Sequence, residues 1–212
     1  MPQAIKVDPR QFWDARFSAE TYAYGTEPND FLRAQAAALP PGDALCLAEG
    51  EGRNAVYLAG LGHRVIAQDL SPVGLGKAEQ LARARGVEIQ CSCCDLNTFQ
   101  PEANSTDLVV AIWMHLEPGL RAVVHQRAIN ALRPGGLLVL EAYRPEQLEL
   151  GTGGPPSLEL LISPEQLRQE LGALEIQWLE SLTRPISEGP FHQGPSAVVQ
   201  FAGRKRPATD TN

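Results

Sequence analysis

Short apolar stretches alternate with longer amphipathic ones along most of the chain. Five stretches have the length and composition of buried strands, and they cover 44–48, 64–68, 87–94, 107–113 and 137–143. Three segments between them repeat apolar residues at helical spacing and predict helices, over 55–59, 73–85 and 118–132. A strand followed by a helix, repeated along a chain, is typical of a parallel sheet with helices on both faces. We therefore expect a doubly wound α/β fold.

An arm rich in aromatic residues precedes this alternation, over residues 8–39. Trp13 and Phe17 are four positions apart, so they would share one face of a helix. An aromatic turn follows at 22–29, and Asp30 is placed to cap the helix that comes next. The rings either pack on the core or cover a flat ligand, and the two roles are compatible.

The last third of the chain departs from the strand–helix alternation. Residues 144–162 form a glycine-rich loop, at the end of the sheet where ligands bind in such folds. Ser163 then starts a helix, with Gln166 completing a capping box. Two final strands are expected to pair and close the sheet around an irregular loop, with the strands at 175–183 and 197–202 and the loop at 184–196.

Length and composition limit the class of protein. The 212 residues suffice for one domain with a full core, which we place at 1–204 and follow with a flexible tail at 205–212. The formal net charge of −7, without a lysine–arginine cluster, argues against binding nucleic acid through its phosphates. No apolar run reaches membrane-spanning length and no signal-peptide core is present, so we expect a cytoplasmic protein without a membrane partner. A monomer or a weak homodimer is expected.

The four cysteines do not have the spacing of a metal site. Cys91, Cys93 and Cys94 lie on one predicted strand, and Cys46 lies on another. No metal is therefore expected. In the cytosol these residues would remain thiols, and we interpret them as small buried hydrophobic residues rather than as metal ligands or redox groups.

The first strand, turn and helix carry the strongest candidate for chemistry. The turn at 49–54 contains two glycines, which permit positive φ and bring backbone N–H groups close to a ligand. A tight turn without a ligand would look the same, and Ala55 stands where a dinucleotide fingerprint has its third glycine. Asp69 ends the next strand about twenty residues further on, where an acid meets ribose hydroxyls in doubly wound nucleotide folds. This acid favours a ligand site.

Four features together resemble the class I S-adenosylmethionine-dependent methyltransferases. They are the turn at 49–54, Asp69, the pair Asp95-Leu96 after the third strand, and the segment 132–136 before the fifth. The resemblance covers roughly residues 10–204. It implies a mostly parallel, seven-stranded Rossmann-like sheet with an antiparallel last strand.

The arm narrows this resemblance. Its segments 12–17 and 24–29 are similar to those of the small bacterial tellurite-resistance and thiopurine methyltransferase-like group. Members of that group methylate small thiols, chalcogen oxyanions or halide-like nucleophiles. The resemblance therefore implies methyl transfer to a small-molecule acceptor, with S-adenosyl-L-methionine as cofactor.

The glycine turn departs from the family pattern at three positions. Cys46 stands where family members commonly have an acid, and Ala48 stands where they have the first glycine. Glu49 precedes the second glycine and could supply the missing carboxylate.

The resemblance also implies the cofactor contacts. Gly50 and Gly52 would let the backbone approach the methionine part of the cofactor, and Glu49 would accept from its ammonium group. Asp69 would bind the ribose hydroxyls, and Asp95 the adenine amino group. The expected cofactor residues are Trp13, Tyr24, Glu49, Gly50, Gly52, Asn54, Asp69, Leu70, Asp95, Leu96, Ile112 and Trp113.

Methyl transfer from a sulfonium mainly requires a positioned nucleophile, and a general base only when the nucleophile arrives protonated. The catalytic candidates are His115, His192 and Tyr143, and for the histidines an ordinary structural role is the alternative. Arg144 and His192 are candidates for holding the acceptor, and Glu141 leaves the same strand as Arg144. The other two histidines are expected at the surface, His63 and His125.

Two other functions fit parts of this pattern. The atypical glycine turn is compatible with a non-catalytic or regulatory S-adenosylmethionine-binding or nucleotide-binding protein on the same fold. A nicotinamide-dependent oxidoreductase fits less well, because the third glycine is missing and the chain ends in a strand pair.

Overall fold

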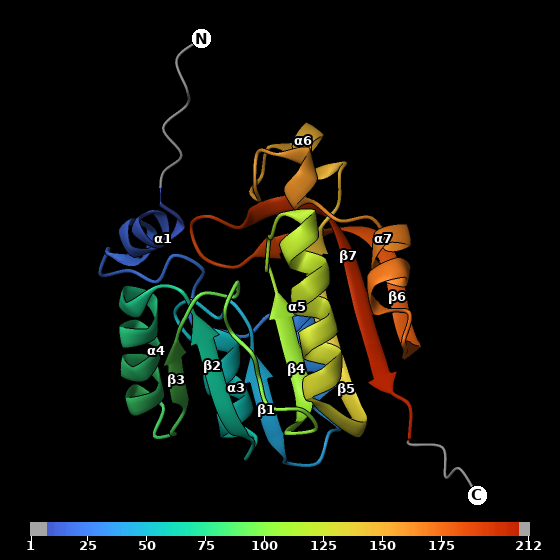
Figure 1. Cartoon of the computed structure of the whole chain (residues 1–212). Helices are drawn as coiled ribbons and strands as arrows, with labels where there is room; N and C mark the ends of the chain where they lie inside the picture. The colour runs from blue at the N-terminus through green and yellow to red at the C-terminus, as the bar shows by residue number, and fades with distance from the viewer. Residues whose placement is uncertain (1–7, 208–212) are drawn as a thin grey trace, which may run out of the picture.

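The computed structural model describes residues 8–207 as a seven-stranded sheet between two layers of helices (Figure 1). The strand order is β3-β2-β1-β4-β5-β7-β6, in which the first five pair in parallel and β7 runs antiparallel to both of its neighbours. The predicted fold class is thus confirmed. The strands are β1 (Asp43–Cys46), β2 (Arg64–Asp69), β3 (Gln90–Cys93), β4 (Thr106–Ile112), β5 (Leu132–Tyr143), β6 (Leu174–Ser187) and β7 (Gln193–Lys205).

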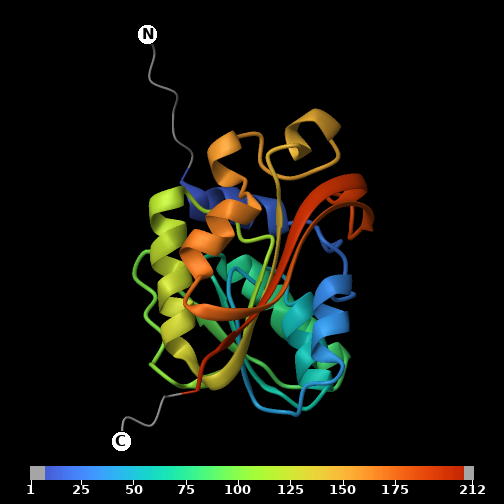
Figure 2. The same cartoon turned by 90° about the vertical axis from the view of Figure 1, so that its right-hand side faces the viewer.

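The helices divide between the two faces of the sheet, as the side view shows (Figure 2). Apolar side chains of α2, α3 and α4 enter the core on one face, and those of α5 and α7 enter the core on the other. The helices are α1 (Pro9–Phe17), α2 (Asp30–Ala36), α3 (Arg53–Gly60), α4 (Pro72–Ala84), α5 (Pro118–Ala131), α6 (Gln147–Leu150) and α7 (Pro164–Leu171), with a 3₁₀ turn at Leu158–Leu160.

Successive residues of the central strands belong to the two cores in alternation. In β4, Leu108 and Val110 join the core under α2 and α3, whereas Val109 and Ala111 join the core under α5 and α7. A strand with both faces buried needs apolar residues at consecutive positions, because successive side chains point to opposite faces. This requirement explains why the central strands read as unbroken apolar runs.

Side-chain caps fix where the helices begin. The capping box predicted at Ser163 is present, with Ser163 and Gln166 each bonding to the other's backbone N–H. The prediction that Asp30 caps α2 is wrong. Asn29 is the N-cap, and its Oδ1 accepts a hydrogen bond from Leu32 N at 3.0 Å.

The final strand pair is longer than the sequence indicated. Most of the expected loop 184–196 belongs to β6 and β7, and only residues 188–192 connect them. The expected tail also starts too early, because Lys205 ends β7 and donates hydrogen bonds to the carbonyls of Asn130 and Leu132. The remainder of the predicted tail, residues 208–212, lies outside the described residues.

Two histidines and one cysteine are not where we expected them. His63 and His125 are buried rather than at the surface. Gly42 N donates to His63 Nδ1, and His125 Nδ1 lies 2.7 Å from a carboxylate oxygen of Glu170. Cys93 is exposed rather than buried, because β3 is an edge strand with only one neighbour.

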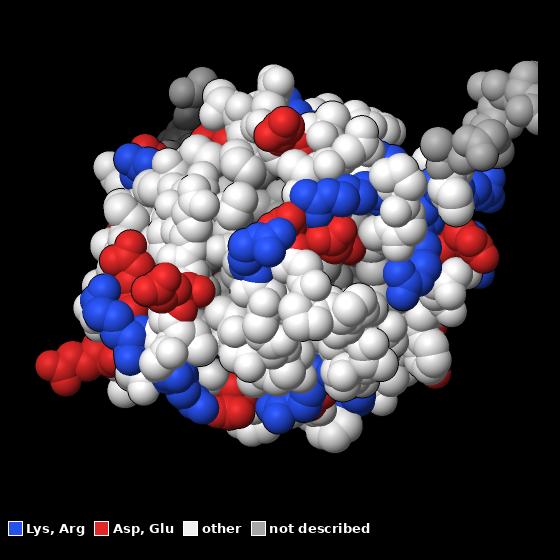
Figure 3. Space-filling view, turned by 90° about the horizontal axis from the view of Figure 1, so that it is seen from below, with Lys and Arg blue, Asp and Glu red and all other residues white. Residues whose placement is uncertain are grey.

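Positive and negative side chains are interspersed on the face at the amino ends of the parallel strands (Figure 3). Asp43 there pairs with Arg64 at 2.7 Å and with Arg133 at 2.8 Å, and Arg133 also pairs with Asp107. Among the helices of the described part of the chain, none is long and apolar enough to cross a membrane.

Three segments far apart in the sequence gather over the carboxyl ends of the strands (Figures 1 and 2). They are the arm around α1, the loop around α6, and the turn between β6 and β7. In an open α/β sheet, ligands bind at this edge. The fold therefore places its most irregular segments where a site is expected.

Gly52→Ala is expected to destabilise the fold by about 2 to 4 kcal/mol. Gly52 has φ 88°, and an added Cβ would lie 2.5 Å from the Cβ of Ala78. Gly60→Ala is the matched control, because it lies in the same helix with nothing within 4 Å of an added Cβ. Urea unfolding should rank Gly52→Ala below wild type and Gly60→Ala at or slightly above it. Equal losses in the two variants would contradict this explanation.

Candidate functional site

The glycine turn is stabilised from within by Glu49. Its Oε1 accepts hydrogen bonds from the backbone N–H groups of Asn54 and Ala55, at 2.9 and 2.8 Å. These are donors of the first turn of α3 that have no partner inside the helix. Glu49 thus caps α3 from within the turn. Its expected contact with a cofactor ammonium remains a prediction.

Burial and the neighbouring groups shift the pKa of Glu49 in opposite directions. Burial raises the pKa of its carboxyl, and the hydrogen bonds from Ala55 and Asn54 and the charge of Arg53 only partly offset this. The resulting pKa is about 7, against an ordinary value of 4.5. Glu49 therefore changes charge near neutral pH.

Asp69 lies beside the turn, at the carboxyl end of β2. Its Oδ2 accepts from Gly50 N and its Oδ1 from Ser71 N, both at 2.8 Å. An ionised carboxylate has about four acceptor positions, so two remain for ligand hydroxyls. Asp95, at the end of the next strand, uses Oδ1 for Asn97, and no described residue bonds its Oδ2. Both acids thus keep acceptor capacity at this edge of the sheet.

The arm covers the turn. The Phe17 ring lies against the backbone of Gly50 and Gly74, where an added Cβ would come within 3.0 and 2.8 Å of it. Trp13 stacks on Phe17 with ring centroids 5.5 Å apart. The Lys77 ammonium pairs with Glu51 and donates to three backbone carbonyls of the arm, those of Phe17, Ala19 and Thr21. These contacts hold the arm directly over the glycine turn.

Five rings from four segments meet next to the turn, and we call them the aromatic box. Trp113 after β4 stacks on Tyr143 of β5 with ring centroids 4.4 Å apart, and the His115 centroid lies 5.6 Å from Tyr143 and 6.4 Å from Trp113. His192, from the β6–β7 turn, lies 5.0 Å from Trp113 and 4.5 Å from Tyr24 of the arm. The box brings together all three catalytic candidates predicted from the sequence.

Several polar atoms of the aromatic box are buried without a hydrogen-bond partner among the described residues. They are Tyr143 Oη, both ring nitrogens of His115, and His192 Nδ1. Burial lowers the pKa of His115 to about 4 and that of His192 to about 3, so both rings are neutral at physiological pH. Buried polar atoms usually have partners, so this cluster is a candidate for binding a ligand.

The glycine-rich loop lies directly on the aromatic box. An added Cβ at Gly153 would come 3.1 Å from Tyr143 Oη, and one at Gly154 would come 2.8 Å from the Tyr143 ring. Only residues without a side chain can pack this closely. An added Cβ at Gly153 would also come 2.8 Å from Phe191 O, so the loop lies beside the turn that carries His192.

A buried ionic network underlies the aromatic box, and reasoning from the sequence did not identify it. Glu141 is fully buried and pairs with Arg184 at 2.7 Å, and Glu188 pairs with Arg53 at 2.7 Å. Asn29 donates to both carboxylates. One signal was available: Arg53 starts a helix, where a cation is unfavourable unless an acid neutralises it.

The remaining residues of the predicted site either bond to other parts of the protein or lie at the carboxyl edge of the sheet. Asn54 Oδ1 accepts from Asn29 N at 2.9 Å, so it joins the turn to the arm. Arg144 pairs with the exposed Glu146 at 3.1 Å, and its Nε is buried without a partner among the described residues. Ile112 and Leu96 are buried, whereas Leu70 is half-buried.

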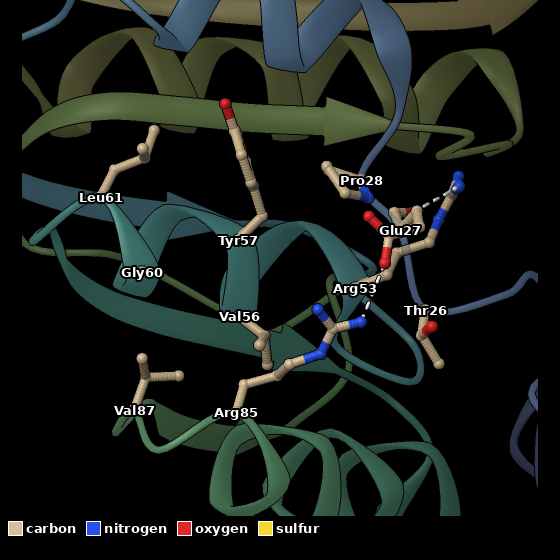
Figure 4. A pocket seen from close by; sticks show the side chains of 10 residues that line it. All are labelled: Thr26, Glu27, Pro28, Arg53, Val56, Tyr57, Gly60, Leu61, Arg85 and Val87. Carbon is tan, nitrogen blue, oxygen red and sulfur yellow. Dashed lines mark hydrogen bonds and ion pairs between the residues drawn. The ribbon is translucent and has the colours of Figure 1, made fainter.

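A hollow of about 300 Å³ lies away from the aromatic box, between the arm, α3 and the end of α4 (Figure 4). Its apolar floor comes from α3, and Glu27 accepts from Arg53 and Arg85 at its rim. No residue of the box lines it, so this hollow is not the site described above.

Comparisons with known proteins concern the segment that contains the glycine turn and the two acids after it. A family model described as a methyltransferase domain matches residues 44–136. This match covers less than half of the chain, and over it the sequence is similar to a methyltransferase domain. This confirms the predicted resemblance, and S-adenosylmethionine is the cofactor that such a domain indicates. The glycine turn, Asp69 and Asp95 all lie inside the matched segment.

One curated relative is the tRNA 5-carboxymethoxyuridine methyltransferase of Escherichia coli K12, 36% identical over 101 residues. That match covers 44% of this chain and 37% of the relative, so the chain matches little more than a third of the relative's length.

Solved structures share the fold over most of the chain. One, from work on the conversion of a disulfide bond into a thioacetal group during echinomycin biosynthesis, has a TM-score of 0.78 at 19% identity, covering 96% of this chain and 94% of its own. TehB from Haemophilus influenzae has a TM-score of 0.69 at 15% identity, covering 93% and 67%. The N-methyltransferase NodS from Bradyrhizobium japonicum WM9, in complex with S-adenosyl-L-homocysteine, has a TM-score of 0.66 at 16% identity, covering 92% and 97%.

The stability gained by Glu49→Gln should depend on pH. With its raised pKa, Glu49 favours folding most below about pH 4.5, and that contribution is lost as the pH rises toward 7. A glutamine keeps the acceptor oxygen and carries no charge. The free energy of unfolding of the Glu49→Gln variant, measured relative to wild type, should rise by about 3 kcal/mol between pH 4.5 and pH 8. Urea unfolding at both pH values measures this, with exposed Glu20→Gln as control, and a difference that does not change with pH would contradict it.

Acid should destabilise the aromatic box through its histidines. Because the pKa values of His115 and His192 are lowered in the fold, the unfolded chain binds their protons first, and stability falls as the pH drops below about 6.5. The variant His192→Gln should lose about 2 kcal/mol less than wild type between pH 7 and 4.5. Thermal unfolding over this range tests it, and parallel curves for the two proteins would rule it out.

Proposed function

We propose that this protein transfers a methyl group from S-adenosylmethionine to a small, flat molecule held in the aromatic box. The observation that supports this best is the position of the box. Five rings meet at the carboxyl ends of β4 and β5, beside the turn in the segment that the family model matches, and three of them, His115, Tyr143 and His192, carry polar atoms without a partner among the described residues.

The cofactor residues of the proposal lie along one edge of the sheet. Asp69 would accept from the ribose hydroxyls through its remaining acceptor positions, and Asp95 Oδ2 would accept from the adenine amino group. The positive φ of Gly50 and Gly52 keeps the backbone free of side chains at the turn. Trp13 and Phe17 would cover the bound cofactor from the arm.

When bound, the cofactor supplies a methyl group already activated on a sulfonium. The protein's part is then to orient the acceptor and to keep water away from it. Trp113 and Tyr143 would line the site of a flat acceptor, and the unpaired atoms of Tyr143 and His115 would hydrogen-bond its edge. Arg144 Nε is a further donor for an anionic group.

The histidines favour an acceptor that needs little help to lose a proton. A general base works best with a pKa near the working pH, and His115 and His192 lie well below it. We therefore assign them hydrogen-bonding roles. A nucleophile that is ionised near neutral pH, such as an aromatic thiol, fits this site better than an alcohol.

Cofactor binding is the first test. Calorimetry should show binding of S-adenosyl-L-homocysteine, and Asp69→Asn should weaken it about tenfold to a hundredfold, because a charged hydrogen bond is lost. Asp107→Asn, at the opposite end of the sheet, is the matched control and should bind like wild type. Absence of binding at high micromolar ligand would overturn the proposal.

The acceptor is tested by release of S-adenosyl-L-homocysteine across a panel. The panel contains benzenethiol, phenol, selenite, tellurite, iodide and tRNA that carries 5-carboxymethoxyuridine, the last because one relative is a tRNA 5-carboxymethoxyuridine methyltransferase. Turnover with a small member supports the proposal, and turnover with tRNA alone would replace it. Cofactor binding without turnover on any member would favour the non-catalytic alternative.

A further inference from the structure

Glu188 is buried between the arm, the glycine turn and the aromatic box, and its carboxylate accepts hydrogen bonds from four side chains. Its Oε2 accepts from Arg53 Nη2 and from Trp113 Nε1, both at 2.7 Å. Its Oε1 accepts from Asn29 Nδ2 at 3.0 Å and from Arg184 Nη2 at 3.3 Å. A carboxylate has about four acceptor positions, so Glu188 has none left for a ligand.

The four donors come from four different elements. Asn29 caps α2, Arg53 begins α3 directly after the glycine turn, Trp113 follows β4, and Arg184 lies in β6. Glu188 itself follows β6. Any effect of Glu188 on a bound ligand must therefore pass through the residues that it holds.

Trp113 is the donor with the most direct place in the site. Its φ is 58°, in the left-handed region that a bulky residue rarely adopts. Its backbone N donates to Glu141 O at 2.9 Å, and its indole N–H donates to Glu188. This pair of bonds sets the plane of the ring that stacks on Tyr143. Glu188 thus orients one wall of the aromatic box.

The same turn carries His192 into the box. Glu188 N donates to His192 O at 2.9 Å, which closes the turn. Gly189 lies flush against the arm, since an added Cβ would come 2.5 Å from Gly25 N and 2.6 Å from Ala23 O. The position of His192 opposite Trp113 therefore depends on the geometry that starts at Glu188.

Charge balance keeps this carboxylate ionised. Burial raises the pKa of Glu188, but the charges of Arg53 and Arg184 and the hydrogen bonds from Arg53 and Trp113 outweigh it and hold the pKa below its ordinary value. Arg184 also pairs with Glu141, whereas Arg53 has no other carboxylate partner among the described residues. Removing the charge of Glu188 leaves Arg53 buried and unpaired.

We propose that Glu188 is a positioning residue for methyl transfer. By binding the Trp113 indole and the Arg53 guanidinium with one carboxylate, it fixes the position of the aromatic box relative to the glycine turn. This inference rests on the proposed function. It adds a residue that touches neither cofactor nor acceptor and acts through the two that it joins.

The test compares Glu188→Gln and Trp113→Phe with the control Glu180→Gln, which removes an exposed carboxylate from the same strand. Three quantities are measured in each folded variant: Trp113 emission, taken as the difference from Trp113→Phe, the Kd for S-adenosyl-L-homocysteine, and kcat for methylation of benzenethiol or of a panel member that reacts faster. Circular dichroism and the melting temperature report folding.

Glu188→Gln is expected to shift Trp113 emission to shorter wavelength, because the indole N–H loses a charged acceptor. Its kcat should fall about 100-fold, the scale of a small misplacement of reacting groups, while the Kd changes far less. The variant that combines Glu188→Gln with Trp113→Phe should be no slower than the slower of the two single variants, because both substitutions act on the same hydrogen bond, the one between Trp113 and Glu188. Glu180→Gln should match wild type in all three quantities.

Wild-type emission and kcat in folded Glu188→Gln would overturn the proposal. So would a lowered melting temperature with unchanged kcat, which is the result of a purely structural role. If Glu188→Gln does not fold, Trp113→Phe decides, because it keeps a ring and removes the N–H, and a wild-type kcat there refutes the inference. Wild-type protein that binds no S-adenosyl-L-homocysteine would instead refute the proposed function itself, before any variant is compared.

Discussion

Two guanidinium groups impose the constraint on which the site depends. Arg53 is buried beside the aromatic box and Arg184 is half-buried there, and a buried cation without a partner costs several kcal/mol. Glu141 on β5 and Glu188 after β6 meet this need. These four residues come from α3, from β5 and from the end of β6. Pairing their charges therefore also fixes how these elements sit around the site.

The elements of the fold could be predicted because their signals are local. An unbroken apolar run such as that of β4 requires burial on both faces, and the turn at 49–54 lies between a strand and a helix within a few residues. Boundaries were less certain. Asn29 and Asp30 are adjacent and both can cap a helix, and only the three-dimensional path of the arm selects Asn29.

The contacts of the site could not be predicted in the same way. Arg53 and Glu188 are 135 positions apart, and no periodicity links residues at that distance. The catalytic candidates His115, His192 and Tyr143 were identified by their position after strands, and the structure brings them together, but their neutral, unpaired state depends on burial by other segments. Sequence reasoning likewise identified Glu49 without revealing that it caps α3.

The glycine turn and the aromatic box differ in how far the match to the methyltransferase family model covers them. The turn, Asp69 and Asp95 lie within the segment that matches the methyltransferase domain, whereas Tyr24, Tyr143 and His192 lie outside it. The turn and the two acids thus lie in the segment that the family model shares, and most of the aromatic box comes from segments outside it, where one fold can vary freely.

The bond between Asn29 and Glu188 has a consequence for how the protein is made. These residues are 159 positions apart, so the two partners leave the ribosome at opposite ends of synthesis. The five parallel strands are complete before the β6–β7 turn exists, but the box lacks His192 until then. Contacts between distant parts of a chain form slowly, because a long loop must close first. The aromatic box is therefore completed only after the β6–β7 turn has been synthesised, and a chain that ends before this turn has the five parallel strands without a complete box.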